Sequence, residues 1–157
     1  TRKQKRVRHS ICIAGLPHAA GDKLIEVRVV PYFGIYQVQI VTDDGRREEA
    51  FAIWAEMEQQ FPEEWCVYHN MADFFVRSRR YEEAEIYYRK AIDVQKAPRF
   101  TDPFEALAQF YEMRGDYTAA VRTLEENLEV CDKEWHFNTG ESADRIRREI
   151  ERLKKKL

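Results

Sequence analysis

The chain of 157 residues contains few helix-breaking residues and few cysteines, with 6 Gly, 5 Pro and 3 Cys. Its cysteines, Cys12, Cys66 and Cys131, are odd in number and far apart, so the sequence predicts neither a disulfide framework nor a CxxC metal site. Scarce Gly and Pro with 34% charged residues favour exposed helices over a loop-rich β-sandwich. We therefore expect a mainly α protein in a reducing, cytoplasmic environment.

Long apolar runs and the common catalytic motifs are also missing. No run approaches the roughly 18 residues that span a bilayer, and the basic N-terminus lacks the apolar stretch of a secretory signal. No GxGxxG, GxxxxGK[ST], HExxH or GxSxG motif occurs. The sequence thus predicts no membrane contact, no cofactor and no enzymatic activity.

The net charge of −2 is unevenly distributed. Residues 1–30 hold seven Lys or Arg against two acids, a balance of +5, which leaves −7 on the other 127 residues. A basic run made of Arg2, Lys3, Lys5, Arg6 and Arg8 can attract nucleic acid. A solvated tail or a linker is the commoner role for a short basic cluster without interleaved aromatic residues.

The first 45 residues carry a strand pattern. Apolar residues alternate with polar ones in "LIEVRVV" (24–30) and "YQVQIVT" (36–42), which predicts two strands, and "PYFGI" between them predicts a hairpin connection. "SICIA" (10–14) is a candidate third strand. We expect residues 1–45 to form a basic segment with a small β hairpin.

From residue 46 the pattern is helical. The predicted helices span 47–61, 64–78, 81–95, 102–114, 117–130 and 141–157. The helix at 102 has a readable start, with Asp102 as N-cap, Pro103 as its first residue and Glu105 reaching back to the cap. Residues 46–157 are therefore predicted to form one helical domain.

Small residues recur at a fixed interval in these helices. Ala50, Ala84 and Ala120 are separated by 34 and 36 residues, and Ala72 and Ala108 by 36. Two antiparallel helices joined by a short turn approach closely only where each offers a small side chain, because a larger one forces the axes apart. A helix pair is being repeated.

The repeated pattern resembles the tetratricopeptide repeat family. Counted from Trp65, the large and small positions of that repeat are filled by Tyr68, Met71, Ala72, Phe75, Tyr81, Ala84, Tyr88 and Ala91. Counted from Thr101, they are filled by Phe104, Leu107, Ala108, Tyr111, Tyr117, Ala120 and Leu124, with Asn127 replacing a small residue. A half unit has Ala50, Trp54 and Pro62, so about two and a half units cover residues 46–131. The resemblance implies a stack of antiparallel helix pairs with a concave groove.

The resemblance also implies which side chains line that groove. They are Cys66, His69, Asn70 and Asp73 in the first unit and Asp102, Glu105, Gln109 and Glu112 in the second. A groove of this composition is expected to be acidic and to favour a basic or amide-rich segment. Family members that bind chaperone C-terminal carboxylates use Lys, Arg and Asn. Only Asn70 fits that pattern, so we do not expect this ligand.

One constellation also suggests chemistry. Cys66, His69 and Asp73 share a helix face and have the residue types of a Cys/His pair or a metal site. No fourth ligand and no oxyanion element accompanies them, so we interpret them as part of the groove.

The final predicted helix has a narrow apolar stripe made of Ala143, Ile146, Ile150, Leu153 and Leu157. Its other faces carry i, i+4 charge pairs, Asp144 with Arg148, Arg145 with Glu149 and Glu151 with Lys155. We expect it to cap the open end of the stack. The alternative is a dimer formed by self-pairing of residues 141–157.

The sequence therefore predicts a non-catalytic module that binds a peptide segment or a partner domain in its groove. The alternatives are a ligand-sensing or regulatory domain of a larger, DNA-binding regulator and direct nucleic-acid contact through residues 2–8. The identity of the partner and the oligomeric state are not encoded in any motif.

Overall fold

The computed structural model describes residues 26–32, 35–41 and 47–157. The chain divides into two compact units, Thr1–Pro62 and Glu63–Leu157. This division places the first helix with the N-terminal strands, whereas the sequence predicted a boundary at residue 45. The basic run at 2–8 and the candidate strand at 10–14 lie outside the described residues.

In the first unit, strands β1 (Glu26–Tyr32) and β2 (Ile35–Val41) pair antiparallel, with Glu26 opposite Val41 and Tyr32 opposite Ile35. Pro31 lies within β1, opposite Tyr36. Helix α1 (Arg47–Gln60) ends two residues before Pro62, which cannot continue a helix because its nitrogen has no proton to donate.

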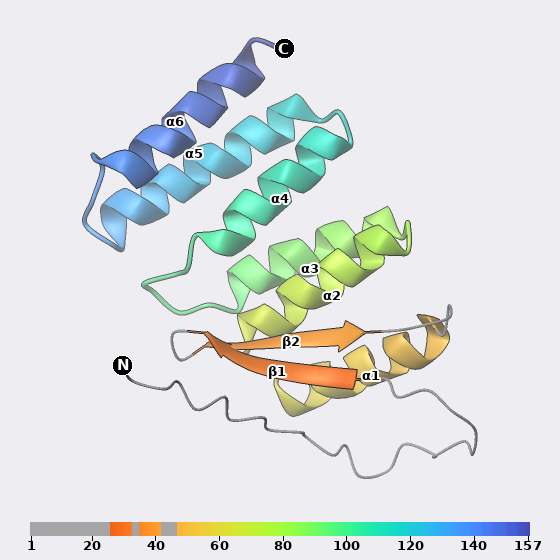
Figure 1. Cartoon of the computed structure of the whole chain (residues 1–157). Coiled ribbons are helices and arrows are strands. Elements are labelled where there is room, and N and C mark those ends of the chain that lie inside the picture. Colours follow the sequence, from red (N-terminus) through yellow and green to blue (C-terminus); the bar gives the residue numbers. More distant parts are fainter. Residues whose placement is uncertain (1–25, 33–34, 42–46) are drawn as a thin grey trace, which may run out of the picture. The chain divides into compact units, whose positions relative to one another are not determined.

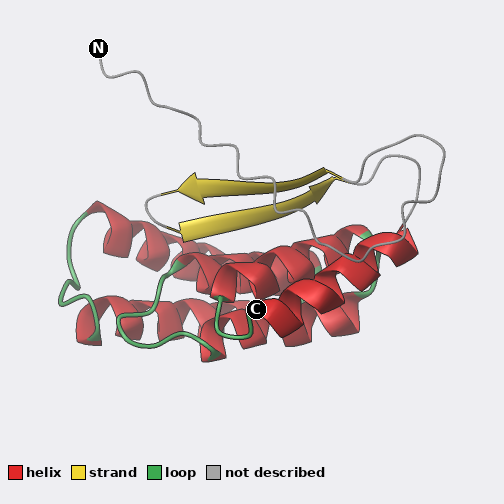
Figure 2. Cartoon of the chain, turned by 90° about the horizontal axis from the view of Figure 1, so that it is seen from below, coloured by secondary structure: helices red, strands yellow, loops and turns green. Residues whose placement is uncertain are grey.

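The second unit consists of helices α2 (Trp65–Arg77), α3 (Tyr81–Asp93), α4 (Asp102–Met113), α5 (Tyr117–Lys133) and α6 (Glu141–Lys154). In Figure 1, α2 and α3 form one antiparallel pair, α4 and α5 a second, and α6 lies beside α5. Short loops join these helices (Figure 2). No helix in the described part of the chain is long and apolar enough to cross a membrane.

The turns inside the two helix pairs repeat each other at an interval of 36 residues. The amide of Arg80 donates to the carbonyl of Phe75, and the amide of Asp116 donates to that of Tyr111, both at 2.9 Å. The residue before each donor has a positive φ, 60° at Arg79 and 79° at Gly115. Gly115 suits this left-handed conformation because it lacks a Cβ. The repeat seen in the sequence is therefore also a repeat of backbone geometry.

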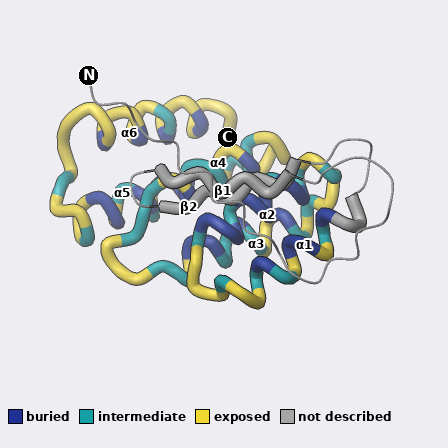
Figure 3. The backbone as a smooth tube through the Cα atoms, turned by 60° about the horizontal axis from the view of Figure 1, so that its bottom comes forward, coloured by how far each residue is buried: buried dark blue, intermediate teal, exposed yellow. Residues whose placement is uncertain are grey.

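The alanines behave as the crossing argument predicts. Ala72, Ala84, Ala108 and Ala120 are all buried, and so is Ala91. In Figure 3 the buried residues form stripes along the helices, while α6 leaves most of its surface exposed. Small side chains therefore occupy the interior of both helix pairs.

Helix α6 caps the stack through a core that it shares with the second helix pair. Its Ile146, Ile150 and Leu153 belong to one apolar cluster with Leu124 and Cys131 of α5. Leu157, expected in the same stripe, is 70% exposed, so that part of the prediction is wrong. The rest of the stripe is buried within the chain, as a cap requires, and the alternative of a dimer through residues 141–157 stays untested.

Two local predictions about helix ends and charge pairs are also wrong. The N-cap of α4 is Thr101 and not Asp102, Pro103 is the second helical residue, and no side chain caps this helix. Asp144 pairs with Arg147 at 2.9 Å and Glu149 with Arg152, three residues apart and not four. Other charged side chains of α6 pair with residues of neighbouring helices, as Arg145 does with Glu105.

Candidate functional site

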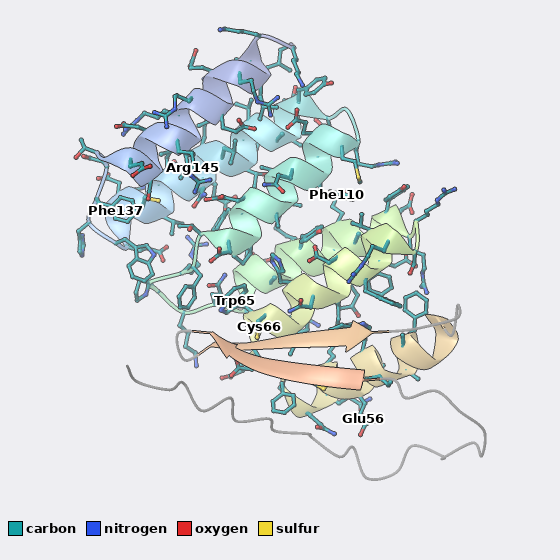
Figure 4. All side chains as sticks on the ribbon, in the orientation of Figure 1. Glu56, Trp65, Cys66, Phe110, Phe137 and Arg145 are labelled. Atoms are coloured by element: carbon teal, nitrogen blue, oxygen red, sulfur yellow. The ribbon has the colours of Figure 1, made fainter. Side chains whose placement is uncertain are left out.

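Two of the predicted groove residues on α2 are buried. Asn70 donates from Nδ2 to the backbone carbonyl of Cys66 at 2.6 Å, inside the helix. Burial, with a smaller contribution from the charge of Glu64, raises the pKa of the Cys66 thiol to about 11. Neither side chain is exposed to a ligand, which corrects their predicted place in the groove. Figure 4 shows Cys66 on α2.

His69 and Asp73, the other two predicted residues on α2, are joined by Tyr88 of α3. The Tyr88 hydroxyl donates to Asp73 Oδ1 at 2.5 Å, and His69 Nε2 lies 3.7 Å from Asp73 Oδ2. The His69 and Tyr88 rings meet edge to face with centroids 5.9 Å apart. Burial raises the pKa of Tyr88, and the charge of Asp73 raises it further, so the hydroxyl remains a donor. The Asp73 side chain is 42% exposed and retains acceptor capacity.

The Cys66, His69 and Asp73 constellation lacks the features of a reactive site. Reactive cysteines have a lowered pKa in a partly exposed, electropositive setting, whereas Cys66 is buried and its pKa is raised. Among the residues that the structure describes, no group of three or more His, Cys, Asp and Glu side chains could hold a metal ion.

Two of the predicted acids on α4, Glu105 and Glu112, are paired with basic residues of α6 and of the residues that follow it. Glu105 accepts from both terminal nitrogens of Arg145, at 2.9 and 2.8 Å. Glu112 accepts from those of Arg152 at 2.8 and 2.5 Å, and from Lys156 Nζ at 2.8 Å. These bonds hold the pKa of Glu112 at about 2. The negative charges of Glu105 and Glu112 are therefore compensated within the chain, while Asp102 is exposed.

A cleft of about 290 Å³ lies among α4, α5 and α6, beside these ion pairs. The buried side chains of Ala108, Leu124, Ile146 and Leu153 give it apolar walls. Glu105, Gln109, Glu112, Arg145 and Glu149 also line it. Gln109 is exposed, as is Asp102 at the start of α4. Glu105, Gln109 and Glu112 thus line one cleft together with residues of α6, and their role in binding stays a prediction.

The basic residues of α6 are the members of the site that the sequence reasoning missed. A signal for them exists, because Glu105 and Glu112 are seven residues apart and so are Arg145 and Arg152. Seven residues are close to two helical turns, so both pairs can form between two helices that run in the same direction. Figure 4 shows Arg145 on α6.

The loop before α4 is fixed to the end of α5 by hydrogen bonds and a ring contact. Arg99 donates to Glu134 from Nε at 2.9 Å, from Nη2 at 2.7 Å and from its backbone amide at 2.7 Å. Trp135 Nε1 donates to the Arg99 carbonyl at 2.6 Å, and its ring lies 6.1 Å from that of Phe100. These contacts position the first turn of α4, where the candidate site begins.

Comparison with known proteins gives a consistent picture of this helical region. Family profiles described as "Tetratricopeptide repeat" match residues 67–98 and 104–134. Among solved structures, the chain is similar to a TPR2B-domain:pHsp70 complex of yeast Sti1, with 26% sequence identity and a TM-score of 0.52. That match covers 71% of this chain and 82% of the other. No curated protein matches the sequence.

Proposed function

Because this chain belongs to the tetratricopeptide repeat family, we propose that residues 63–157 form a non-catalytic module that binds a segment of another protein. The observation that carries this proposal is the polar and apolar surface shared by α4 and α6. It combines an apolar cleft with fixed side chains on rigid helices, which is the usual composition of a binding site. The similar yeast domain was solved as a pHsp70 complex, which supports a peptide as ligand.

The ion pairs of α4 limit which side chains of a bound segment can interact with this helix. A lysine or arginine of a partner would have to displace Arg145 or Arg152, which already fill Glu105 and Glu112 with paired hydrogen bonds. An amide group does not have to displace an arginine at the exposed Gln109, and at Asp73 it can use the acceptor capacity left beside the bond from Tyr88. Of the basic or amide-rich ligand predicted from the sequence, we therefore retain the amide-rich segment.

The test starts without a known partner. Random dodecapeptides displayed on phage are selected on the immobilised chain, and the affinities of the selected peptides are measured by fluorescence anisotropy. Asp73→Lys and Gln109→Trp alter two groove helices, while Ile86→Gln alters a 63% exposed position on α3 and serves as control.

We expect the two groove substitutions to weaken binding by about tenfold or more, the effect of losing a contact worth about 1.4 kcal/mol. The Ile86 variant should bind like the unmodified chain. Selected peptides that bind all variants equally, or that lose affinity only with Ile86→Gln, would contradict the proposed groove.

A further inference from the structure

The cleft among α4, α5 and α6 has a defined length and floor. The two ion pairs, Glu105 with Arg145 and Glu112 with Arg152, flank it seven residues apart on each helix, a distance of about 10 Å along an α-helix. Between them Ala108 contributes only a methyl group, because the crossing of α4 with α5 requires a small residue there. The short side chain leaves space that α6 does not fill.

The three carboxylates that line the cleft are already engaged by basic side chains. Glu105 is bonded to Arg145, which also lines the cleft, and Glu112 and Glu149 are bonded to Arg152. Bringing a further charge into this space would leave that charge unpaired, which is costly in a partly desolvated site. A neutral group meets no such penalty.

The volume limits how much of a ligand can enter. At about 290 Å³ the cleft lies at the lower end of the range of ligand pockets, so it suits one residue of a longer segment more than a whole drug-sized molecule. Its apolar lining residues, Ala108, Leu124, Ile146 and Leu153, belong to the apolar cluster that joins α6 to the stack.

We propose that this cleft receives one large aliphatic side chain, of the leucine, isoleucine or methionine class, from the bound segment. Gln109, exposed at the rim, then hydrogen-bonds the segment's backbone beside that residue. This inference rests on the proposed function and adds a position-specific requirement to it: a neutral aliphatic residue flanked by the two ion pairs.

Three blocked tripeptides test the requirement directly: acetyl-Gly-Leu-Gly-amide, acetyl-Gly-Lys-Gly-amide and acetyl-Gly-Asp-Gly-amide. Each is titrated into the ¹⁵N-labelled full chain at millimolar concentration and followed by amide chemical shifts. The leucine peptide should shift the signals of Gln109, Ile146 and Leu153 in a saturable way, with an affinity at least tenfold higher than the other two. Equal affinities, preference for the lysine peptide, or shifts confined to other helices would overturn the proposal.

Two variants locate the binding. Gln109→Trp places a large ring at the mouth of the cleft and should abolish saturation by the leucine peptide, while unchanged α2 and α3 signals show that the fold is intact. Arg148→Gln lies on the exposed side of α6, outside the cleft lining, and should bind like the unmodified chain. Unchanged binding by the Gln109 variant would place the leucine peptide elsewhere.

The outcomes separate this proposal from the general one. Selected dodecapeptides whose affinity depends on Asp73 but not on Gln109 would refute binding in the cleft and support segment binding elsewhere in the groove. A leucine tripeptide that binds as described, together with the absence of any selected dodecapeptide, would retain the cleft and refute segment binding.

Discussion

Replacing Ala84 by leucine tests the packing on which the stack depends. Ala84 is 0% exposed, and Ala72, the small residue of the helix paired with it, is buried as well. Leucine adds three carbon atoms where no space is available, so either the helix axes separate or the side chain leaves its preferred rotamers. Overpacking of this kind costs about 1–3 kcal/mol.

Urea denaturation followed by circular dichroism at 222 nm measures this cost. With a urea dependence of about 2 kcal/mol per molar for a small protein, the midpoint should fall by about 0.5–1.5 M. Glu82→Leu is the matched control, because Glu82 is exposed on the same helix. Glu83 is less suitable, because replacing it would also remove its 2.8 Å hydrogen bond from Arg80. The control should change stability by less than about 0.5 kcal/mol. Equal losses at both positions would refute the packing argument.

Three further substitutions have defined outcomes. Asn127→Ala should raise the free energy of unfolding by about 1 kcal/mol, because neither polar atom of this 0% exposed amide has a partner among the described residues. The urea midpoint should rise accordingly, and a lower midpoint would contradict this. Tyr88→Phe should cost about 1 kcal/mol through the lost bond to Asp73, and a double-mutant cycle with Asp73→Asn should show non-additivity. Glu112→Gln should be most destabilising above pH 4.5 and progressively less so as the pH falls through about 2, because the lowered pKa of Glu112 contributes stability that is lost over this range. A difference between Glu112→Gln and the unmodified chain that is the same at pH 7 and pH 2 would show that this carboxylate contributes nothing.

The helical stack could be predicted because its physical requirement is local and repeated. A close helix crossing needs a small residue, so Ala72, Ala84, Ala108 and Ala120 mark two crossings at one interval. Gly115 marks one tight turn in the same way, through its positive φ. Such signals do not depend on distant parts of the chain.

The start of α4 shows where local signals mislead. Asp102, Pro103 and Glu105 fit the pattern of a capping box, but Glu105 bonds to Arg145, forty residues away. Two hydrogen bonds to a guanidinium outweigh one to a backbone amide, because both partners are charged. The local pattern at residues 102–105 does not predict this distant partner.

The groove residues were only partly predictable for a related reason. Helical spacing shows that Cys66 and Asn70 share a side of α2 with His69 and Asp73, but it does not show how deeply that side is covered. The charge of the groove depends in the same way on α6, because Arg145 pairs with Glu105 of α4 and not with Glu149 of its own helix. The charge of a surface and the burial of its residues depend on how the helices pack together.

Photo-cross-linking of a selected peptide shows whether the surface shared by α4 and α6 holds a segment of another protein. A benzoylphenylalanine placed at the peptide's aliphatic anchor is irradiated with the full chain, and the cross-linked residues are identified by mass spectrometry. We expect products at Gln109 and around Arg145. Products concentrated near Ile86 on α3, or spread evenly over the chain, would contradict this expectation.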